Sequence, residues 1–223
     1  MAEDYTTARM VTLTDGVLSI AMTLLVLDVR LPEAAEKLGN TELWAALVAI
    51  RPQLASYGIS FLVIAILWLS HVQKFRRLTR MTALMIWLNI LFLLGVSIVP
   101  FTTSLLAENG NAVSTAVYAV GMAFASLMLA AMSVHVTLAG LFDPKAGPGH
   151  LRAVSILQFG TGAIFLISAG VAFIDADLAK YLWFLLIPLG FVRDRHSPEH
   201  ANDREGHGSA TEASEAKAET ADG

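Results

Sequence analysis

The sequence predicts an all-α polytopic membrane protein with six transmembrane helices. Hydrophobic residues make up 55% of its 223 residues and charged residues only 15%, whereas a soluble domain typically carries about 25% charged residues. Its mean hydropathy is +0.60. Several apolar runs reach about 20 residues, which is the helix length that crosses about 30 Å of hydrocarbon. These runs do not alternate between apolar and polar residues, so they do not suit a membrane-spanning barrel.

The apolar runs and the residues that interrupt them set the expected order of elements. The six helices are expected at residues 9–31, 53–74, 82–106, 113–140, 151–173 and 178–193. Residues 33–52 indicate a polar, mildly amphipathic connection. Pro100 is expected to kink or end the third helix, because it lacks a backbone N–H. Turns are expected at residues 109–111, which read Asn-Gly-Asn, and at 143–149, which are rich in glycine and proline.

Positive charges follow every second predicted helix. The basic residues of these connections are Lys74, Arg76, Arg77, Arg80, Lys145, Arg152, Arg193 and Arg195. Because cytoplasmic loops carry an excess of lysine and arginine, we expect these connections and both termini on the cytoplasmic side of a bacterial plasma membrane. We expect residues 1–193 to form the six-helix transmembrane domain. Residues 194–223 are expected to be a disordered cytoplasmic tail, because their polar composition cannot bury a core.

The first predicted helix begins with a carboxylate inside the membrane. Asp15 precedes the apolar run from Val17 to Leu27, and an ionised side chain in a bilayer needs a partner or water. His71 lies near the inner end of the second helix, and Asn89 lies nearly two turns into the third. The predicted topology places these three polar residues at similar depth, so we expect them to meet. The alternative for His71 is a packing histidine that satisfies one hydrogen bond.

An apolar stripe runs along the first helix. Ile20, Leu24 and Leu27 fall at positions i, i+4 and i+7, which lie on one helical face, and Thr23 lies beside that face. Such a stripe either packs one helix against another or lines a pore whose constrictions are apolar side chains. The spacing alone does not choose between these two interpretations.

The polar start of the first helix resembles a known signature. Arg9-x-x-x-Leu13-Thr14-Asp15-Gly16 is similar to the Arg-x-x-x-Phe-Ser-Asp-Gly signature of the transmembrane protein 175 family. This family comprises lysosomal potassium channels and their bacterial relatives. Leucine replaces phenylalanine and threonine replaces serine, so the apolar and hydroxyl characters are kept.

The resemblance extends over the next two helices, to about residue 101. Trp68, His71 and Phe75 match the family's Trp-x-x-His-x-x-x-Phe pattern, and residues 87–101 are similar to its third helix. The resemblance implies six helices per subunit and a homotetramer with a central pore lined by the first helix. It also implies a potassium-selective channel that rings of apolar side chains constrict.

The same resemblance assigns roles to individual residues. The pore and selectivity residues that it implies are Ile20, Thr23, Leu24 and Leu27. The residues that it implies as supports for the pore helix are Arg9, Thr14, Asp15, Trp68, His71 and Asn89. Potassium ions would occupy the pore transiently, and the partners would be membrane lipid and other copies of the chain. No cofactor, resident metal ion or nucleic acid is expected.

Other functions have weaker support in the sequence. The main alternative is a proton-coupled secondary transporter with Asp15 and His71 as the relay, but such transporters often contain internal repeats and none is visible. A membrane scaffold without transport is a third interpretation. An enzyme is not expected, because the sequence lacks nucleotide-binding loops, metalloprotease motifs and nucleophile elbows. It also lacks the carbonyl filter sequence Thr-Val-Gly-Tyr-Gly, so potassium selectivity would have to arise in another way.

Overall fold

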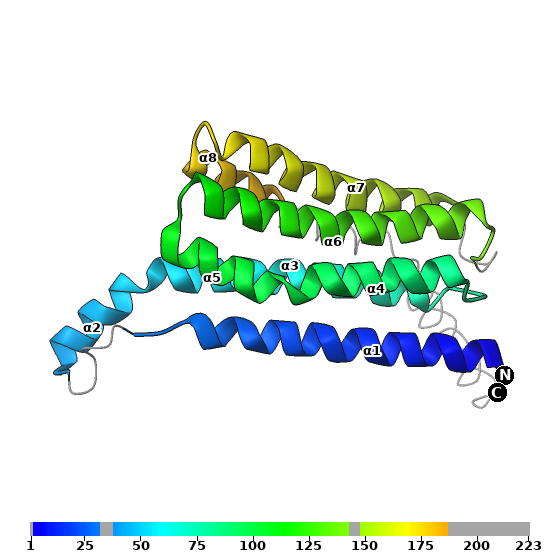
Figure 1. Cartoon of the computed structure of the whole chain (residues 1–223), viewed down its shortest axis with the longest axis horizontal. Helices are drawn as coiled ribbons and strands as arrows, with labels where there is room; N and C mark the ends of the chain where they lie inside the picture. The colour runs from blue at the N-terminus through cyan, green and yellow to red at the C-terminus, as the bar shows by residue number, and fades with distance from the viewer. Residues whose placement is uncertain (1, 32–37, 143–147, 187–223) are drawn as a thin grey trace, which may run out of the picture.

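The computed structural model describes residues 2–31, 38–142 and 148–186, and this part of the chain is nearly all helical (Figure 1). In chain order the elements are α1 (Ala2–Leu24), the 3-10 helix η1 (Leu25–Asp28), α2 (Asn40–Ala49), α3 (Arg51–Phe75), α4 (Ala83–Ser97), α5 (Val99–Asn109), α6 (Ala112–Leu138), α7 (Pro148–Val171), α8 (Ala176–Tyr181) and the 3-10 helix η4 (Leu182–Leu185).

Four helical stretches of the described chain are long and apolar enough to cross a membrane. They are Thr6–Asp28, Arg51–Phe75, Ala83–Asn109 and Ala112–Leu138. Helix α7 has 24 residues, or roughly 36 Å at 1.5 Å per residue, and its apolar part is Gln158–Val171. The expectation of a helical, multi-pass membrane protein is therefore confirmed. Of the sixth predicted helix, the structure describes only α8 and η4, and residues 187–193 lie outside the described residues, as does the predicted tail.

The long helices lie side by side along one axis (Figure 1). Helix α1 runs along one edge of the bundle and α7 along the opposite edge, with α3, α4, α5 and α6 between them. Helix α6 packs against α7, α4 and α5, whereas α1 contacts α3, α4 and α5. The start of α1 and the α3–α4 turn lie at one end of the bundle, which we call the basic end. The α5–α6 turn and α8 lie at the other end, which we call the Gly110 end.

Local sequence explains the breaks between helices. Pro100 occupies one of the first two positions of α5, so the third predicted helix divides at Ile98, because proline cannot donate to the preceding turn. Gly110 ends α5 with φ of 59°, in the left-handed region, which glycine adopts without steric cost. Asn111 then caps α6, because its side-chain oxygen accepts from the Ser114 N–H at 3.0 Å. The predicted turn at residues 109–111 is confirmed.

Two predicted boundaries were wrong. Helix α1 begins at Ala2 and not near residue 9, because no glycine or proline interrupts residues 2–8. It tightens into η1 after Leu24, and the backbone is extended at Val29, with ψ of 97°, so the helix does not reach residue 31.

The connection at residues 33–52 contains helix α2. Gly39 caps the start of this helix, and its N–H donates to the Glu42 carboxylate at 3.1 Å.

Small residues let α4 approach α6 closely. A Cβ atom at Gly95 would lie 2.9 Å from Phe124 Cδ1, which is too close without a shift of one of the two groups, and 3.1 Å from the Ala125 Cβ, which is also a tight contact. Ala119, Ala123 and Ala125 of α6 are buried, and their small side chains leave room for this close packing. Close backbone approach is a common basis of helix association in membranes, where lipid removes the hydrophobic driving force.

Candidate pore helix and its anchoring network

Helix α1 has one buried face and one exposed face. Thr14, Leu18, Ala21 and Leu25 follow a helical spacing and have exposed fractions of 0–2%. On the other side, the predicted stripe of Ile20, Leu24 and Leu27 is 59%, 42% and 60% exposed. Packing within the chain therefore leaves this stripe uncovered. Such an apolar face is free to meet lipid or other copies of the chain.

Thr23 lies on the same exposed side of α1. Its hydroxyl donates within the helix, at 3.0 Å to the Ser19 carbonyl and 2.9 Å to the Ile20 carbonyl. A hydroxyl that donates its proton keeps lone pairs on the oxygen. The Thr23 oxygen is thus able to offer electron density to a cation outside the helix.

A chain of buried hydrogen bonds holds the opposite face of α1. Asn89 Nδ2 donates to Thr14 Oγ1 at 3.0 Å, and Thr14 Oγ1 in turn donates to the Met10 carbonyl at 2.8 Å. Asn89 Oδ1 lies 2.9 Å from His71 Nε2. Because an amide oxygen only accepts, His71 must carry its proton on Nε2. The contacts therefore run from α3 through α4 to the backbone of α1.

The ring of His71 is also fixed by its aromatic neighbours. It stacks on Phe75, with ring centroids 4.0 Å apart, and on Phe92, with centroids 5.7 Å apart. The ring is fully buried, and its Nδ1 atom has no hydrogen-bond partner among the described residues. The structure thus places His71 as a packed donor between α3 and α4.

Asp15 binds a different partner from the one expected. Its Oδ1 accepts from the Trp68 indole Nε1 at 2.8 Å, whereas His71 bonds to Asn89. The structure brings Thr14, His71 and Asn89 together and joins Asp15 to Trp68, so that two separate contacts tie α1 to α3 and α4. Arg9, the remaining predicted support residue, has an exposed side chain on α1.

Lys74 is buried, although its charge had placed it among the basic residues of the cytoplasmic connection that follows the second predicted helix. Its exposed fraction is 5%. Its Nζ donates to the Leu129 carbonyl and lies 3.4 Å from Gln158 Oε1, which also accepts from Ser133 Oγ at 2.6 Å. No carboxylate among the described residues forms an ion pair with it. Lys74 therefore joins α3 to α6 and α7 through uncharged oxygens.

The spacing of the inward-facing residues of α3 was a signal that would have identified Lys74 as a buried residue. Ser60, Leu67 and Lys74 are seven residues apart and all buried, so the lysine continues the inward-facing side of the helix. The pattern of positive charges predicted the topology, but it did not indicate that Lys74 is buried. An ionisable residue inside a membrane bundle is a candidate for a functional or specific structural role.

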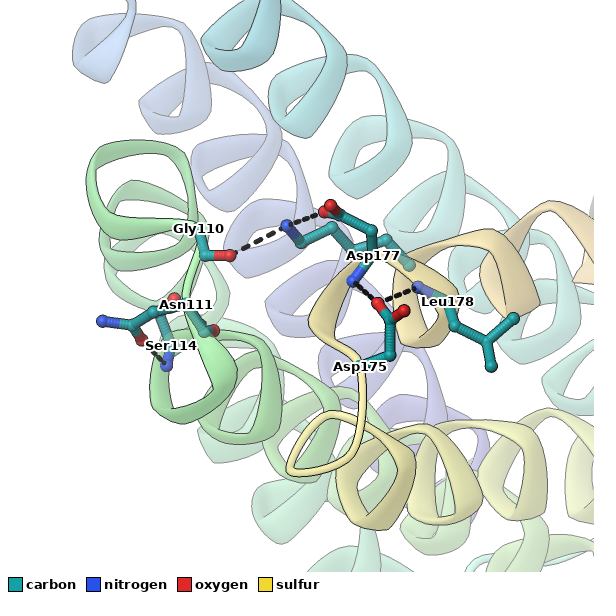
Figure 2. A network of polar contacts seen from close by, with 7 residues as sticks. Gly110, Asn111, Ser114, Asp175, Asp177 and Leu178 are labelled. Carbon is teal, nitrogen blue, oxygen red and sulfur yellow. Dashed lines mark hydrogen bonds and ion pairs between the residues drawn. The ribbon is translucent and has the colours of Figure 1, made fainter.

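A second polar network lies at the Gly110 end of the bundle (Figure 2). Asp175 caps α8 by accepting from the N–H groups of Asp177 and Leu178 at 2.9 and 3.0 Å. Lys180 Nζ donates to the Gly110 carbonyl at 2.9 Å and to Asp177 Oδ1 at 3.0 Å. The turn between α5 and α6 is therefore tied directly to α8.

Comparisons with known proteins agree on one family. The family model described as endosomal/lysosomal potassium channel TMEM175 matches residues 9–100. A potassium channel of Streptomyces collinus is 38% identical over 177 residues, which cover 76% of this chain and 84% of that protein. A potassium channel of Chamaesiphon minutus is 30% identical over 192 residues, or 82% of this chain and 93% of that one.

The fold has a matching solved structure. The crystal structure of a lysosomal potassium-selective channel TMEM175 homologue from Chamaesiphon minutus superimposes with a TM-score of 0.74 at 25% identity, over 85% of this chain and 98% of that one. The segment that the family model matches contains the exposed stripe of α1 and the hydrogen bonds of Thr14, Asn89 and His71.

Proposed function

This chain belongs to the TMEM175 family, and we propose that it forms a potassium-selective channel. The proposal draws on relatives that are named potassium channels. The observation that carries it is the exposed apolar stripe on α1, a face that packing within the chain leaves uncovered. In this proposal the stripe faces the ion path, and the protein carries ions without catalysis.

The proposed pore needs several copies of the chain, because one helix face cannot enclose a passage. A homotetramer of six-helix subunits places four copies of α1 around one axis. Ile20, Leu24 and Leu27 then form successive apolar rings, whose exposed fractions of 42–60% in the single chain leave them available for this contact. Apolar constrictions of this kind also close pores by dewetting.

Selectivity in this pore follows from the cost of dehydration. Potassium is larger than sodium and less strongly hydrated, so it sheds water at lower cost in a narrow ring of Ile20 side chains. Apolar rings offer no replacement ligands, and discrimination should be weaker than in carbonyl filters. The Thr23 oxygens, whose protons are committed to the helix, supply part of the missing coordination.

The buried network has a supporting role in this proposal. Thr14, His71 and Asn89 hold the inner face of α1 against α3 and α4, while the Asp15–Trp68 bond adds a second attachment. These contacts fix the rotation of α1, so that the stripe points away from its own subunit. Arg9 would act at the same end of α1. A proton relay between Asp15 and His71 is not favoured, because each binds a different residue.

The proposed setting is a bacterial plasma membrane with both termini in the cytoplasm. Positive charge at the basic end, from Arg76, Arg77 and Arg80, supports this orientation. We propose that residues 1–193 form the channel domain and that residues 194–223 form a cytoplasmic tail.

Replacing Ile20 with asparagine tests the pore assignment. The polar amide offers ligands to sodium at the narrowest ring, so the sodium-to-potassium permeability ratio should rise severalfold in flux assays on reconstituted vesicles. The matched control is Ile174→Asn, which changes an isoleucine that is 86% exposed beyond the end of α7 and should leave the ratio unchanged. Equal sodium-to-potassium permeability ratios in the Ile20→Asn variant and the wild type would refute the role of Ile20.

A further inference from the structure

A cavity of about 420 Å³ lies at the Gly110 end of the bundle. Its walls come from the start of α3, the end of α5, and the α8–η4 segment. Along α3 the cavity extends from Pro52 to Ile59, or about 10 Å at 1.5 Å per residue. Because these residues belong to the first three turns of a membrane span, the cavity lies within one leaflet and close to its headgroups.

The floor of the cavity is apolar. Tyr118 and Trp183 contribute their rings there, but their polar atoms are engaged elsewhere: the Tyr118 hydroxyl lies 3.0 Å from Ser60 Oγ, and the Trp183 Nε1 donates to Ser168 Oγ at 2.7 Å. Apolar cavities of this kind do not hold ordered water well. The volume equals roughly fourteen water-sized groups of about 30 Å³ each, which is enough for a large part of one acyl chain.

The mouth of the cavity carries one charge of each sign. The Lys180 ammonium lies between the Gly110 carbonyl and the Asp177 carboxylate, and the Asp177 side chain is 80% exposed. In Figure 2, dashed lines run from this ammonium to Gly110 on one side and to Asp177 on the other. At the rim, Tyr181 and Phe184 are 67% and 50% exposed, and tyrosine is typical of a membrane–water interface.

We propose that this cavity binds a phospholipid with an ethanolamine headgroup. One acyl chain fills the apolar floor between α3, α5 and η4. The lipid phosphate accepts from Lys180, and the primary ammonium of the headgroup donates to Asp177. A choline headgroup has no N–H to donate to Asp177, and an anionic headgroup without an amine leaves Asp177 facing like charge. The site thus distinguishes lipids by charge complementarity, independently of whether the protein conducts potassium.

Retention of lipid by the purified full-length protein tests the cavity. Ala107 lines it, and the Ala107→Phe variant places a ring in it that should obstruct the path of an acyl chain. The retained phosphatidylethanolamine, measured by native mass spectrometry, should fall by about tenfold. The matched control is Val113→Phe, at an exposed position of α6 at the same end, and it should retain lipid like the wild type. Equal retention in the two variants would overturn the proposal. A loss of oligomer mass in Ala107→Phe with unchanged lipid would also overturn it, and would assign the cavity to contact between copies.

The headgroup is tested by a change that leaves the cavity intact. In mixed micelles with equal phosphatidylethanolamine, phosphatidylcholine and phosphatidylglycerol, the wild type should retain the ethanolamine lipid preferentially. Asp177→Asn keeps the shape of an exposed side chain and removes its charge, so the preference over phosphatidylcholine should fall by about threefold, as expected for an exposed charge contact. A preference for phosphatidylglycerol, or a ratio that Asp177→Asn does not change, would refute the headgroup assignment.

Discussion

Replacing Asn89 with leucine tests how strongly the buried network holds α1. The amide of Asn89 makes two contacts between helices: it donates to Thr14 Oγ1 at 3.0 Å and accepts from His71 Nε2 at 2.9 Å. All three side chains are fully buried, so water cannot replace the amide. Leucine has a similar branched shape, and the substitution therefore removes hydrogen bonds with little loss of packing.

The expected cost follows from these contacts. Hydrogen bonds between membrane helices average about 0.6 kcal/mol each, whereas a buried donor left without an acceptor costs about 1–3 kcal/mol. Asn89→Leu leaves His71 with no partner on either ring nitrogen, because Nδ1 already lacks one. We therefore expect the free energy of unfolding to fall by about 2–3 kcal/mol.

The assay is reversible unfolding in sodium dodecyl sulfate, with the partner residue as the control. His71→Phe keeps the stacking on Phe75 and Phe92 but removes the donor. Replacing both partners of a buried hydrogen bond by apolar groups costs far less than replacing one. The free energy of unfolding of the double variant, Asn89→Leu with His71→Phe, should therefore exceed the value expected from adding the two single effects by at least about 1 kcal/mol. Additive single effects would contradict the hydrogen bond between these residues.

Two further predictions concern packing. Lys74→Met removes a buried amine that forms no ion pair with a carboxylate among the described residues. The substitution should leave the free energy of unfolding unchanged or raise it by up to about 2 kcal/mol. A loss of more than about 1 kcal/mol on the same assay would show that the contacts with Leu129 and Gln158 outweigh the cost of burying the amine. Gly95→Ala puts a Cβ atom 2.9 Å from Phe124 and should destabilise the protein by about 1–3 kcal/mol. Gly58→Ala is its control, because nothing lies within 4 Å of the added carbon, and equal effects of the two changes would argue against close α4–α6 packing.

Features that depend on local chemistry were predicted well from the sequence. The four apolar spans, the division of the third helix at Pro100 and the turn at Gly110 follow from hydrophobicity, a missing backbone N–H and a left-handed backbone angle. The periodicity of α1 also placed Ile20, Leu24 and Leu27 on one face, which the structure leaves exposed. The family resemblance of residues 9–101 is confirmed by the match to residues 9–100.

Features that depend on partners distant in sequence were predicted less well. Asp15 was expected beside His71 and Asn89, but the rotation of α1 turns it toward the Trp68 indole. Depth in the membrane, which the topology provides, does not fix the angle about the helix axis. Lys74 was placed with the neighbouring arginines in the cytoplasmic connection after the second helix. The structure instead buries it, and its contacts are carbonyl and amide oxygens of α6 and α7.

The central claim is that the exposed face of α1 lines the ion path, and single cysteines test it most directly because the chain has no cysteine of its own. Thr23→Cys places a thiol on this face, and Ile167→Cys places one at a position of α7 that is 60% exposed on the opposite edge of the bundle. Silver ions, which bind thiolates, should abolish potassium flux through the Thr23→Cys protein and leave flux through Ile167→Cys unchanged. Full potassium flux through silver-treated Thr23→Cys, with its thiol shown to be modified, would contradict the account.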